Sequence, residues 1–273
     1  PEIFSSEDAT VTLGVGKNMV NAIRFWLLAT RFIESVERGY KTTVLGEAIF
    51  GPDGYDPYLE DEATIWLIHW LIASNPEQAT AWFWFFNHFH KPEFETAEVV
   101  AALLDFTQQK ITAKCAATTI EKDAALVLRM FARARGNTRT PLEDMLDSPL
   151  TQLKLITQSS TGRGYVSALA ERDGLPIGIF GYALAELFND LDVSELPTKD
   201  LMYSKAGYTS PGAVFRLTEN ALLAKLEKLI YALPGFFEVR ETAGIHQVYR
   251  VSEVDPMRLL AFHYLEQSKE VAA

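Results

Sequence analysis

The sequence predicts a mainly α protein with small β-hairpins (α+β), in which winged helix-turn-helix-like modules flank a helical middle. Apolar residues recur at helical spacing through much of the chain. Two short β-rich runs, within 36–51 and 236–251, each follow an expected helix, as a wing follows its helix. All five tryptophans lie at or before Trp84, so we expect the N-terminal part to share one core.

The composition is that of a packed globular protein. The chain has 273 residues, and 48% of them are hydrophobic, which excludes a disordered class. Because no run of about 18 apolar residues occurs, neither a spanning helix nor a membrane partner is expected. The single cysteine, Cys115, excludes an intrachain disulfide and favours a cytoplasmic location.

Charge is unevenly distributed along the chain. The net charge is −11, yet residues 10–50 carry +2 and residues 108–140 carry +5, leaving −18 for the rest. Screening limits the reach of distant charges to about 8–10 Å, so an acidic protein with basic patches can still bind nucleic acid locally. The overall charge excludes a protein that coats DNA without selectivity.

Residues 1–51 are expected to form an N-terminal winged-helix-like module. Its elements are a serine-capped helix that ends at Gly14, an amphipathic helix over 17–35, and a hairpin followed by a helical turn within 36–51. A winged helix usually begins with one more helix, and that first helix is expected upstream of Pro1.

Residues 52–140 are expected to form a helical domain. Helices are predicted near 57–75, 77–89, 96–111 and 118–134, the first with acidic residues in its first turn and the last two with threonine caps. The stretch RGNTRTP at 135–141 is the best candidate for a linker.

Residues 141–273 are expected to form a mixed α/β domain with a helix and β-hairpin, again winged-helix-like. The stretch 153–176 fits either a hairpin with its turn near 160–164 or a strand followed by a helix. A helix is predicted over 177–191. Another begins after Thr218 and ends before Pro234, followed by a hairpin around Ala243-Gly244.

The tetrapeptide Gly14-Val15-Gly16-Lys17 suggests a nucleotide site but lacks the required spacing. A P-loop needs a glycine five residues before Gly16, where Val11 stands, and a hydroxyl after the lysine, where Asn18 stands. A dinucleotide fingerprint would need glycine in place of Met19. We therefore expect no bound nucleotide and interpret the glycines as a turn between two helices.

The second expected helix carries a cationic repeat. Lys17, Arg24 and Arg31 are seven residues apart, and Arg38 continues the interval. Seven residues make nearly two helical turns, so these cations drift by only about 20° per step. Met19, Ile23, Trp26, Thr30 and Ile33 fall on the opposite face. The start of such a helix is where helix-turn-helix proteins contact DNA; the alternative is an ordinary solvated face.

The predicted contacts to double-stranded DNA form two groups. The first lies on the helix and its wing, and the second lies around the expected linker: Lys17, Asn18, Asn21, Arg24, Arg38 and Lys41; Arg129, Arg133, Arg135 and Arg139. For the second group the alternative is the solvated C-terminal end of a helix, where cations are favourable.

Metal chemistry has only weak candidates. Nucleases use clustered carboxylates to hold Mg²⁺ or Mn²⁺, and the weak catalytic candidates here are Asp56, Glu60, Asp61 and Asp123. An acidic turn that starts a helix explains the first three equally well. His88 and His90 lack a set of partners at zinc-ligand spacing, so no zinc is expected, and His69 is interpreted as a core residue.

Three blocks, 9–34, 44–89 and 118–133, resemble a known family. Their most specific parts are LGVGKNMV at 13–20 and DPYLED at 56–61. On these blocks, within a resemblance that spans roughly 4–265, the sequence resembles a bacterial domain family of formerly unknown function. That family is similar to the SspB component of Ssp-type DNA phosphorothioation systems.

The resemblance implies a role in antiviral defence. It implies a partner of a cysteine desulfurase, an ATPase and an ATP-pyrophosphatase-like sulfur transferase, which replace a non-bridging phosphate oxygen of DNA with sulfur. It also implies a DNA nickase, although no catalytic motif of the family carries over to residues of this sequence.

Three functions follow as hypotheses. The first is a DNA-binding component that nicks one strand by metal-assisted hydrolysis. The second is a non-catalytic winged-helix adaptor or regulator that recruits the modification enzymes, and the third is an acidic scaffold whose cations are only surface. A homodimer is left open.

Overall fold

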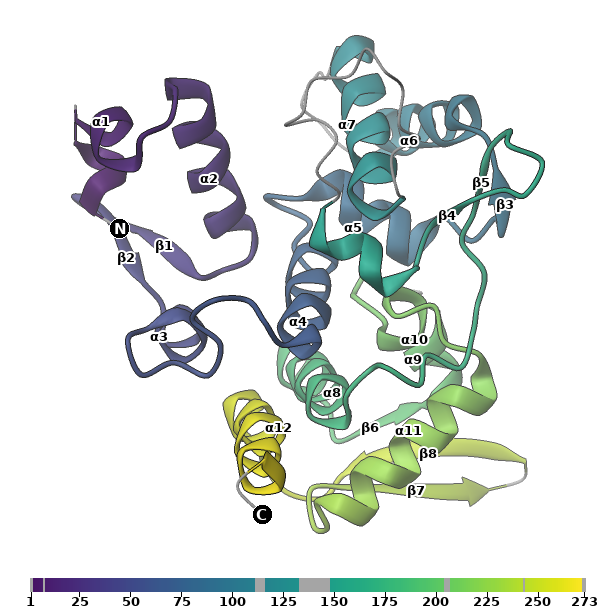
Figure 1. Ribbon diagram of the computed structural model, residues 1–273. Helices are drawn as coiled ribbons and strands as arrows, with labels where there is room; N and C mark the ends of the chain where they lie inside the picture. The colour runs from purple at the N-terminus through teal and green to yellow at the C-terminus, as the bar shows by residue number, and fades with distance from the viewer. Residues whose placement is uncertain are drawn as a thin grey trace.

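A computed structural model describes residues 2–6, 8–110, 116–132, 148–203, 207–242 and 244–271. Within this part of the chain the fold is α+β: helices dominate, and the strands form three small antiparallel sheets (Figure 1). No helix found there is long and apolar enough to cross a membrane.

The N-terminal elements form a small helical group with one hairpin. In order they are η1 (Glu2–Ser5), α1 (Ala9–Leu13), α2 (Lys17–Ala29), β1 (Ile33–Val36), β2 (Gly39–Thr42) and α3 (Val44–Phe50). The predicted helix over 17–35 is too long. The Thr30 hydroxyl donates to the Trp26 carbonyl at 2.7 Å, and Arg31 adopts a φ of 58°. The left-handed residue turns the chain, so Ile33 begins a strand instead.

The middle elements are almost entirely helical, as predicted. They are α4 (Glu62–Ala73), α5 (Thr80–His88), β3 (Glu93–Phe94), α6 (Thr96–Lys110) and α7 (Ala117–Phe131). Only the short strand β3 departs from that prediction. Helix α4 is buried on nearly all sides, and Asp61 caps its N-terminus by accepting from the backbone N–H of Ala63 at 2.8 Å.

The C-terminal elements combine helices with the two remaining sheets. They are η3 (Pro149–Leu153), β4 (Thr157–Gln158), β5 (Tyr165–Val166), α8 (Ile177–Leu191), β6 (Glu195–Pro197), α9 (Thr198–Met202), α10 (Pro211–Val214), α11 (Glu219–Ala232), β7 (Phe237–Thr242), β8 (Ile245–Arg250) and α12 (Pro256–Val271). Of the two alternatives predicted for 153–176, the structure has the hairpin, β4–β5. Strand β5 is the middle strand in the order β3-β5-β4, so it also pairs with β3.

The third sheet has the order β6-β8-β7, with both pairs antiparallel. The predicted hairpin at 236–251 is confirmed, and β6 and the final helix α12 are additions that the sequence pattern did not reveal. Helix α12 packs closely on α8 because Gly178 has no side chain: a Cβ there would lie 2.7 Å from His263 Cβ and from the Leu259 carbonyl oxygen.

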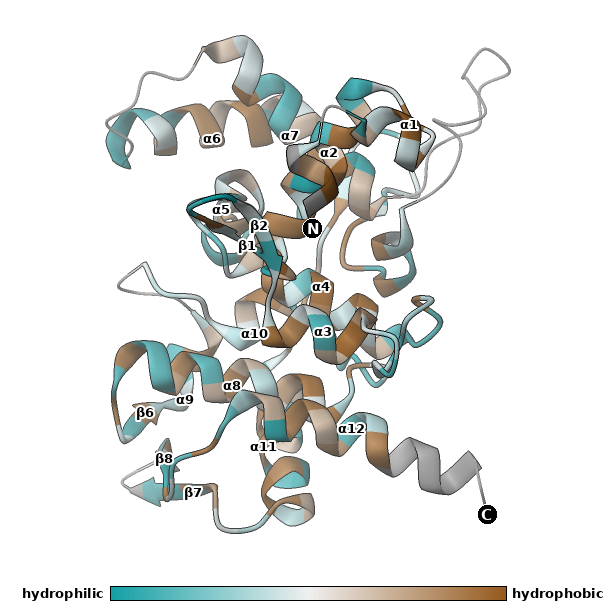
Figure 2. Cartoon of the chain, turned by 90° about the vertical axis from the view of Figure 1, so that its left-hand side faces the viewer, coloured by the Kyte–Doolittle hydropathy of each residue, from teal (hydrophilic) through white to brown (hydrophobic). Residues whose placement is uncertain are grey.

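One buried cluster runs from Ala29 to Tyr264 and draws on all three predicted domains. Figure 2 shows apolar residues gathered in α4 and α8 near the centre, whereas the hairpin β1–β2 is largely hydrophilic. The boundaries at 51/52 and 140/141 stay a prediction, and the core that crosses them is continuous.

Two buried polar side chains belong to this core. The Arg216 guanidinium donates to the carbonyls of Phe85 at 3.0 Å and Phe89 at 3.0 Å, which lie at the C-terminal end of α5. Burial lowers its pKa to about 9. His69, predicted as a core residue, is fully buried, and its Nε2 lies 2.8 Å from the Val214 carbonyl oxygen. Burial lowers the His69 pKa to about 3, so the ring is neutral.

Candidate nucleic-acid interface

The corner between α1 and α2 is open to solvent. Gly14 ends α1 with a φ of 66°, in the left-handed region that favours glycine, which confirms the predicted turn. Gly16 stands at the N-cap position of α2, and no side chain caps the first turn. Lys17 and Asn18 are exposed. Uncapped N–H groups and the positive end of the helix dipole make such a position favourable for an anion.

The cations of α2 continue along its outer face toward the hairpin. Arg24 Nη2 donates to Asn21 Oδ1 at 3.2 Å, and its guanidinium carbon lies 5.7 Å from the centre of the Tyr40 ring. The aromatic ring and the amide hold the guanidinium beside β2. Phe25, next to Arg24, is 37% exposed, which is unusual for a phenylalanine. Sequence periodicity alone did not single out Phe25 or Tyr40.

The hairpin β1–β2 supplies the remaining cations of this group. Arg38 is exposed in the turn between the two strands. Lys41 lies opposite Glu34 in the strand register, and their Nζ and Oε1 atoms are 2.9 Å apart. Arg38 therefore presents its charge to solvent, whereas much of the Lys41 charge is matched by its neighbour.

Arg31 does not share this outer face, although it belongs to the seven-residue repeat. Its guanidinium donates to both carboxylate oxygens of Glu186, at 3.2 and 3.1 Å, and to the Ser74 hydroxyl at 3.0 Å. Glu186 also accepts from Trp70 Nε1 and from the Tyr182 hydroxyl, each at 2.7 Å. Arg31 lies just beyond the end of α2, which ends at Ala29. Through these bonds it links the N-terminal elements to α4 and α8.

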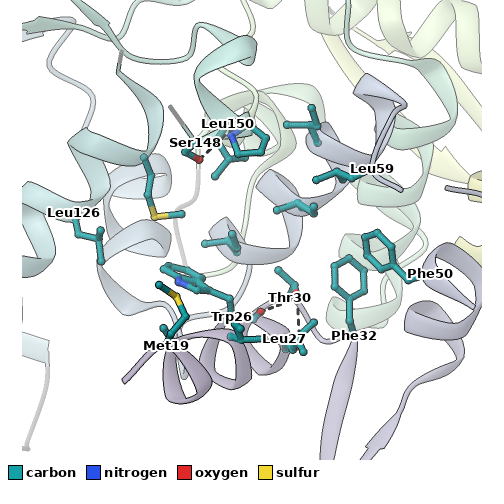
Figure 3. Close-up of a pocket in the computed structure, with 17 residues that line it drawn as sticks. Met19, Trp26, Leu27, Thr30, Phe32, Phe50, Leu59, Leu126, Ser148 and Leu150 are labelled. Atoms are coloured by element: carbon teal, nitrogen blue, oxygen red, sulfur yellow. Dashed lines mark hydrogen bonds between the residues drawn. The ribbon is translucent and has the colours of Figure 1, made fainter. Parts of the chain in front are cut away.

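The inner face of α2 lines an apolar groove of about 700 Å³. Met19 and Trp26 face Leu126 of α7 across it, as Figure 3 shows, and α4 contributes Ile68 and Ile72. The predicted apolar face of α2 is thus confirmed, whereas Arg31, predicted for the cationic face, lies beyond the end of the helix. Because the apolar face turns toward the body, Lys17, Asn21 and Arg24 point the other way.

Of the second predicted group of DNA contacts, the structure describes only Arg129. Arg129 is exposed on the last turn of α7. Arg133, Arg135 and Arg139 lie outside the described residues, so their position relative to α2 stays a prediction.

The weak catalytic candidates do not assemble into a carboxylate cluster in the described part of the chain. Asp56 is buried, and its carboxylate accepts from the N–H of Glu60 at 2.7 Å, the N–H of Asp61 at 3.1 Å and the Thr64 hydroxyl at 2.6 Å. These bonds hold the loop before α4. Burial raises the pKa of Asp123, which lies on α7, apart from the loop.

Asp61 and the C-terminal helix meet beside this loop. His263 Nε2 lies 3.4 Å from Asp61 Oδ2, and the Thr64 hydroxyl lies 2.7 Å from the Tyr264 hydroxyl. The Tyr55 ring stacks on the Tyr264 ring at 4.9 Å. Among the residues that the structure describes, no group of three or more His, Cys, Asp or Glu side chains is placed to hold a metal ion. The contacts of Asp56, Asp61 and Thr64 join this loop to α4 and α12.

Comparisons with known proteins agree with this fold. A family model described as a protein of unknown function, DUF4007, matches residues 1–266. The SspB crystal structure has a TM-score of 0.82 and 25% identity, covering 98% of this chain and 80% of that chain. A magnesium ion-bound SspB crystal structure has a TM-score of 0.82 and 26% identity over the same shares. No curated protein matches the sequence.

Proposed function

Because the chain belongs to the DUF4007 family and its fold resembles that of SspB, we propose that it is a DNA-binding component of a bacterial phosphorothioation defence system. The observation that carries DNA binding is the outer face of α2. There an uncapped helix N-terminus and the side chains of Lys17 and Asn18 are exposed, and the half-buried Arg24 is held beside them by Tyr40. Phosphate groups of a duplex would meet these donors first.

Gly16 supports close approach of a phosphate backbone. Its φ of −67° is open to any residue, and a Cβ built there meets nothing within 4 Å. The fold of the described chain therefore does not require glycine at this position. A glycine lets a phosphate reach the N–H groups of the first turn of α2 without a side chain in between.

We further propose that the chain binds DNA in the manner of a winged-helix protein. At the N-terminus, α1, α2 and the hairpin β1–β2 follow the order helix, helix, wing. At the C-terminus, the order α8, β6, α9, α11, β7 and β8, with the short helix α10 between α9 and α11, supports a second winged-helix-like module. The two ends differ in charge: α2 carries cations and no acid, whereas α11 presents Glu219 and Glu227 together with Lys228. We assign DNA recognition to the N-terminal module alone.

The proposal that the protein nicks one DNA strand with Mg²⁺ or Mn²⁺ rests on the resemblance to SspB. A magnesium ion-bound structure exists for SspB. The described residues here do not fit a metal cage of their own, because the Asp56 carboxylate is already bonded to three donors and Asp123 stands apart from the loop.

One paired experiment tests the proposal. The chain is titrated into a labelled duplex in a gel-shift assay at several salt concentrations, and the same preparation is incubated with supercoiled plasmid and Mg²⁺, Mn²⁺ or a chelator. Salt-sensitive binding with metal-dependent open circles supports the nickase. Binding without open circles supports the non-catalytic adaptor. Absence of binding at about 50 mM salt contradicts both, and leaves the acidic scaffold.

A further inference from the structure

A second groove lies between α11 and the strand β7. Its volume is about 590 Å³. Helix α11 contributes Leu223, Glu227, Ile230 and Tyr231, which occupy one flank of the helix at i, i+4, i+7 and i+8. This flank is distinct from the positions that α11 buries in the core, such as Leu222 and Leu226. The groove lies away from α2 (Figure 1).

Strand β7 is at the edge of its sheet. In the order β6-β8-β7 it pairs only with β8. The Val251 N–H donates to the Phe236 carbonyl at 2.8 Å, and these two residues continue the β7–β8 register. Hydrogen-bonded and non-hydrogen-bonded pairs alternate along an antiparallel ladder. The N–H and C=O groups of Val239 and Glu241 therefore point away from β8, along the open edge beside the groove.

The groove has an acidic wall and an apolar floor. Leu223, Ile230 and Val239 supply the floor, and the exposed carboxylates of Glu227 and Glu241 flank it. Neither of these two acids forms an ion pair in the described part of the chain. Tyr231 is 91% exposed beside them. An exposed aromatic ring beside a small apolar floor is typical of a surface that binds another chain.

We propose that this groove binds a basic, extended peptide segment of a partner protein, which adds to β7 as a further strand. The peptide backbone would pair with the outward groups of Val239 and Glu241, as in strand-addition complexes. Every second side chain would enter the groove, where apolar residues meet Leu223 and Ile230. Lysine or arginine at other positions of this same set, two residues apart along the strand, would face Glu227 and Glu241. The charge of these two carboxylates selects against an acidic segment. The inference does not depend on DNA binding by α2.

The test uses a fluorescein-labelled nine-residue peptide, Thr-Lys-Thr-Val-Thr-Lys-Thr-Val-Thr, with the full chain and fluorescence polarisation. Its lysines and valines share one face of an extended strand. A second peptide carries glutamate in place of lysine, and a third carries proline at two central positions, which prevents strand pairing. We expect the first peptide to bind, and the other two to bind at least about tenfold more weakly.

Variants of the chain locate the site. Glu227→Lys with Glu241→Lys should weaken binding of the lysine peptide by about tenfold or more, and Tyr231→Ala by about fivefold. Tyr58→Ala is the matched control, because Tyr58 is 82% exposed on the loop before α4, and it should change binding by less than about twofold. Glu241→Pro should weaken binding more than Glu241→Gln, since only proline removes the outward N–H. Thermal melts verify that each variant folds.

Three results would overturn the inference. The first is no binding of the lysine peptide to the unaltered chain. The second is equal affinity after both acids are reversed, and the third is equal affinity for the proline peptide, which would exclude strand addition. Because DNA affinity is measured separately on the same variants, failure here is distinguishable from failure of the DNA-binding proposal.

Discussion

Replacing Lys17 and Arg24 by glutamine should reduce the slope of log DNA affinity against log salt concentration to less than half of its original value. Among the first group of cations, Lys17 and Arg38 are exposed and Arg24 is half-buried with no acidic partner, whereas Lys41 is matched by Glu34 at 2.9 Å. Three phosphate contacts predict a slope of about −2.7 in a plot of log affinity against log salt. Affinity should then fall about 40-fold between about 50 and about 200 mM salt.

The double variant retains only Arg38, so its slope should be about −0.9 and its loss over the same range about threefold. Gel shifts or polarisation with a labelled duplex measure both slopes. Lys199→Gln with Lys228→Gln is the matched control, since both lysines are exposed on the C-terminal part. An unchanged slope in the Lys17 and Arg24 variant, or an equal drop in the control, would refute the assignment of DNA contact to α2.

Three further predictions concern the core. Glu186→Ala should lower the free energy of unfolding by about 3 kcal/mol in urea, because it leaves the buried donors of Trp70 and Tyr182 unpaired; a change below about 1 kcal/mol would contradict the linking role. Arg216→Met should cost about 3 kcal/mol or more by the same measurement, since carbonyls at the end of α5 lose their donors, whereas a stable variant would mean that water replaces them. The His69 pKa falls from 6.5 to about 3 on folding, so only the unfolded chain takes up a proton between these values and stability declines as pH falls below 6.5. The decline attributable to this group is about 1.4 kcal/mol per pH unit, and the pH dependence of His69→Gln should be shallower by that amount; parallel curves would show that another group titrates.

For helix α2, side-chain periodicity predicted the buried face but not the end of the helix. The spacing of Met19, Ile23 and Trp26 predicted its apolar face, and that face lines the groove toward α4 and α7. The same spacing could not predict where the helix ends. The end depends on the left-handed turn at Arg31, which is stabilised by Glu186, a residue far away in the sequence. A local pattern carries no information about such a partner.

The acidic loop illustrates the same limit for a site. Asp56, Glu60 and Asp61 look like a metal cluster in the sequence, because three carboxylates fall within six residues. In the folded chain the Asp56 carboxylate is consumed by backbone and hydroxyl donors, and Asp61 caps α4 and faces His263 of the last helix. Whether an acid binds a cation or the protein's own N–H groups depends on which donors surround it.

The sequence by itself determined the helical character of the chain, the glycine corner before α2, the two hairpins and the resemblance to SspB. These features depend on residues that are neighbours along the chain, through side-chain periodicity, glycine conformation and β-propensity. The tertiary structure alone decided which cations are exposed, which acids are bonded internally, and that β7 leaves an open edge beside α11. These properties depend on burial and on partners brought together from distant segments, so the same residue type serves as an anchor at Arg31 and as a surface charge at Arg38.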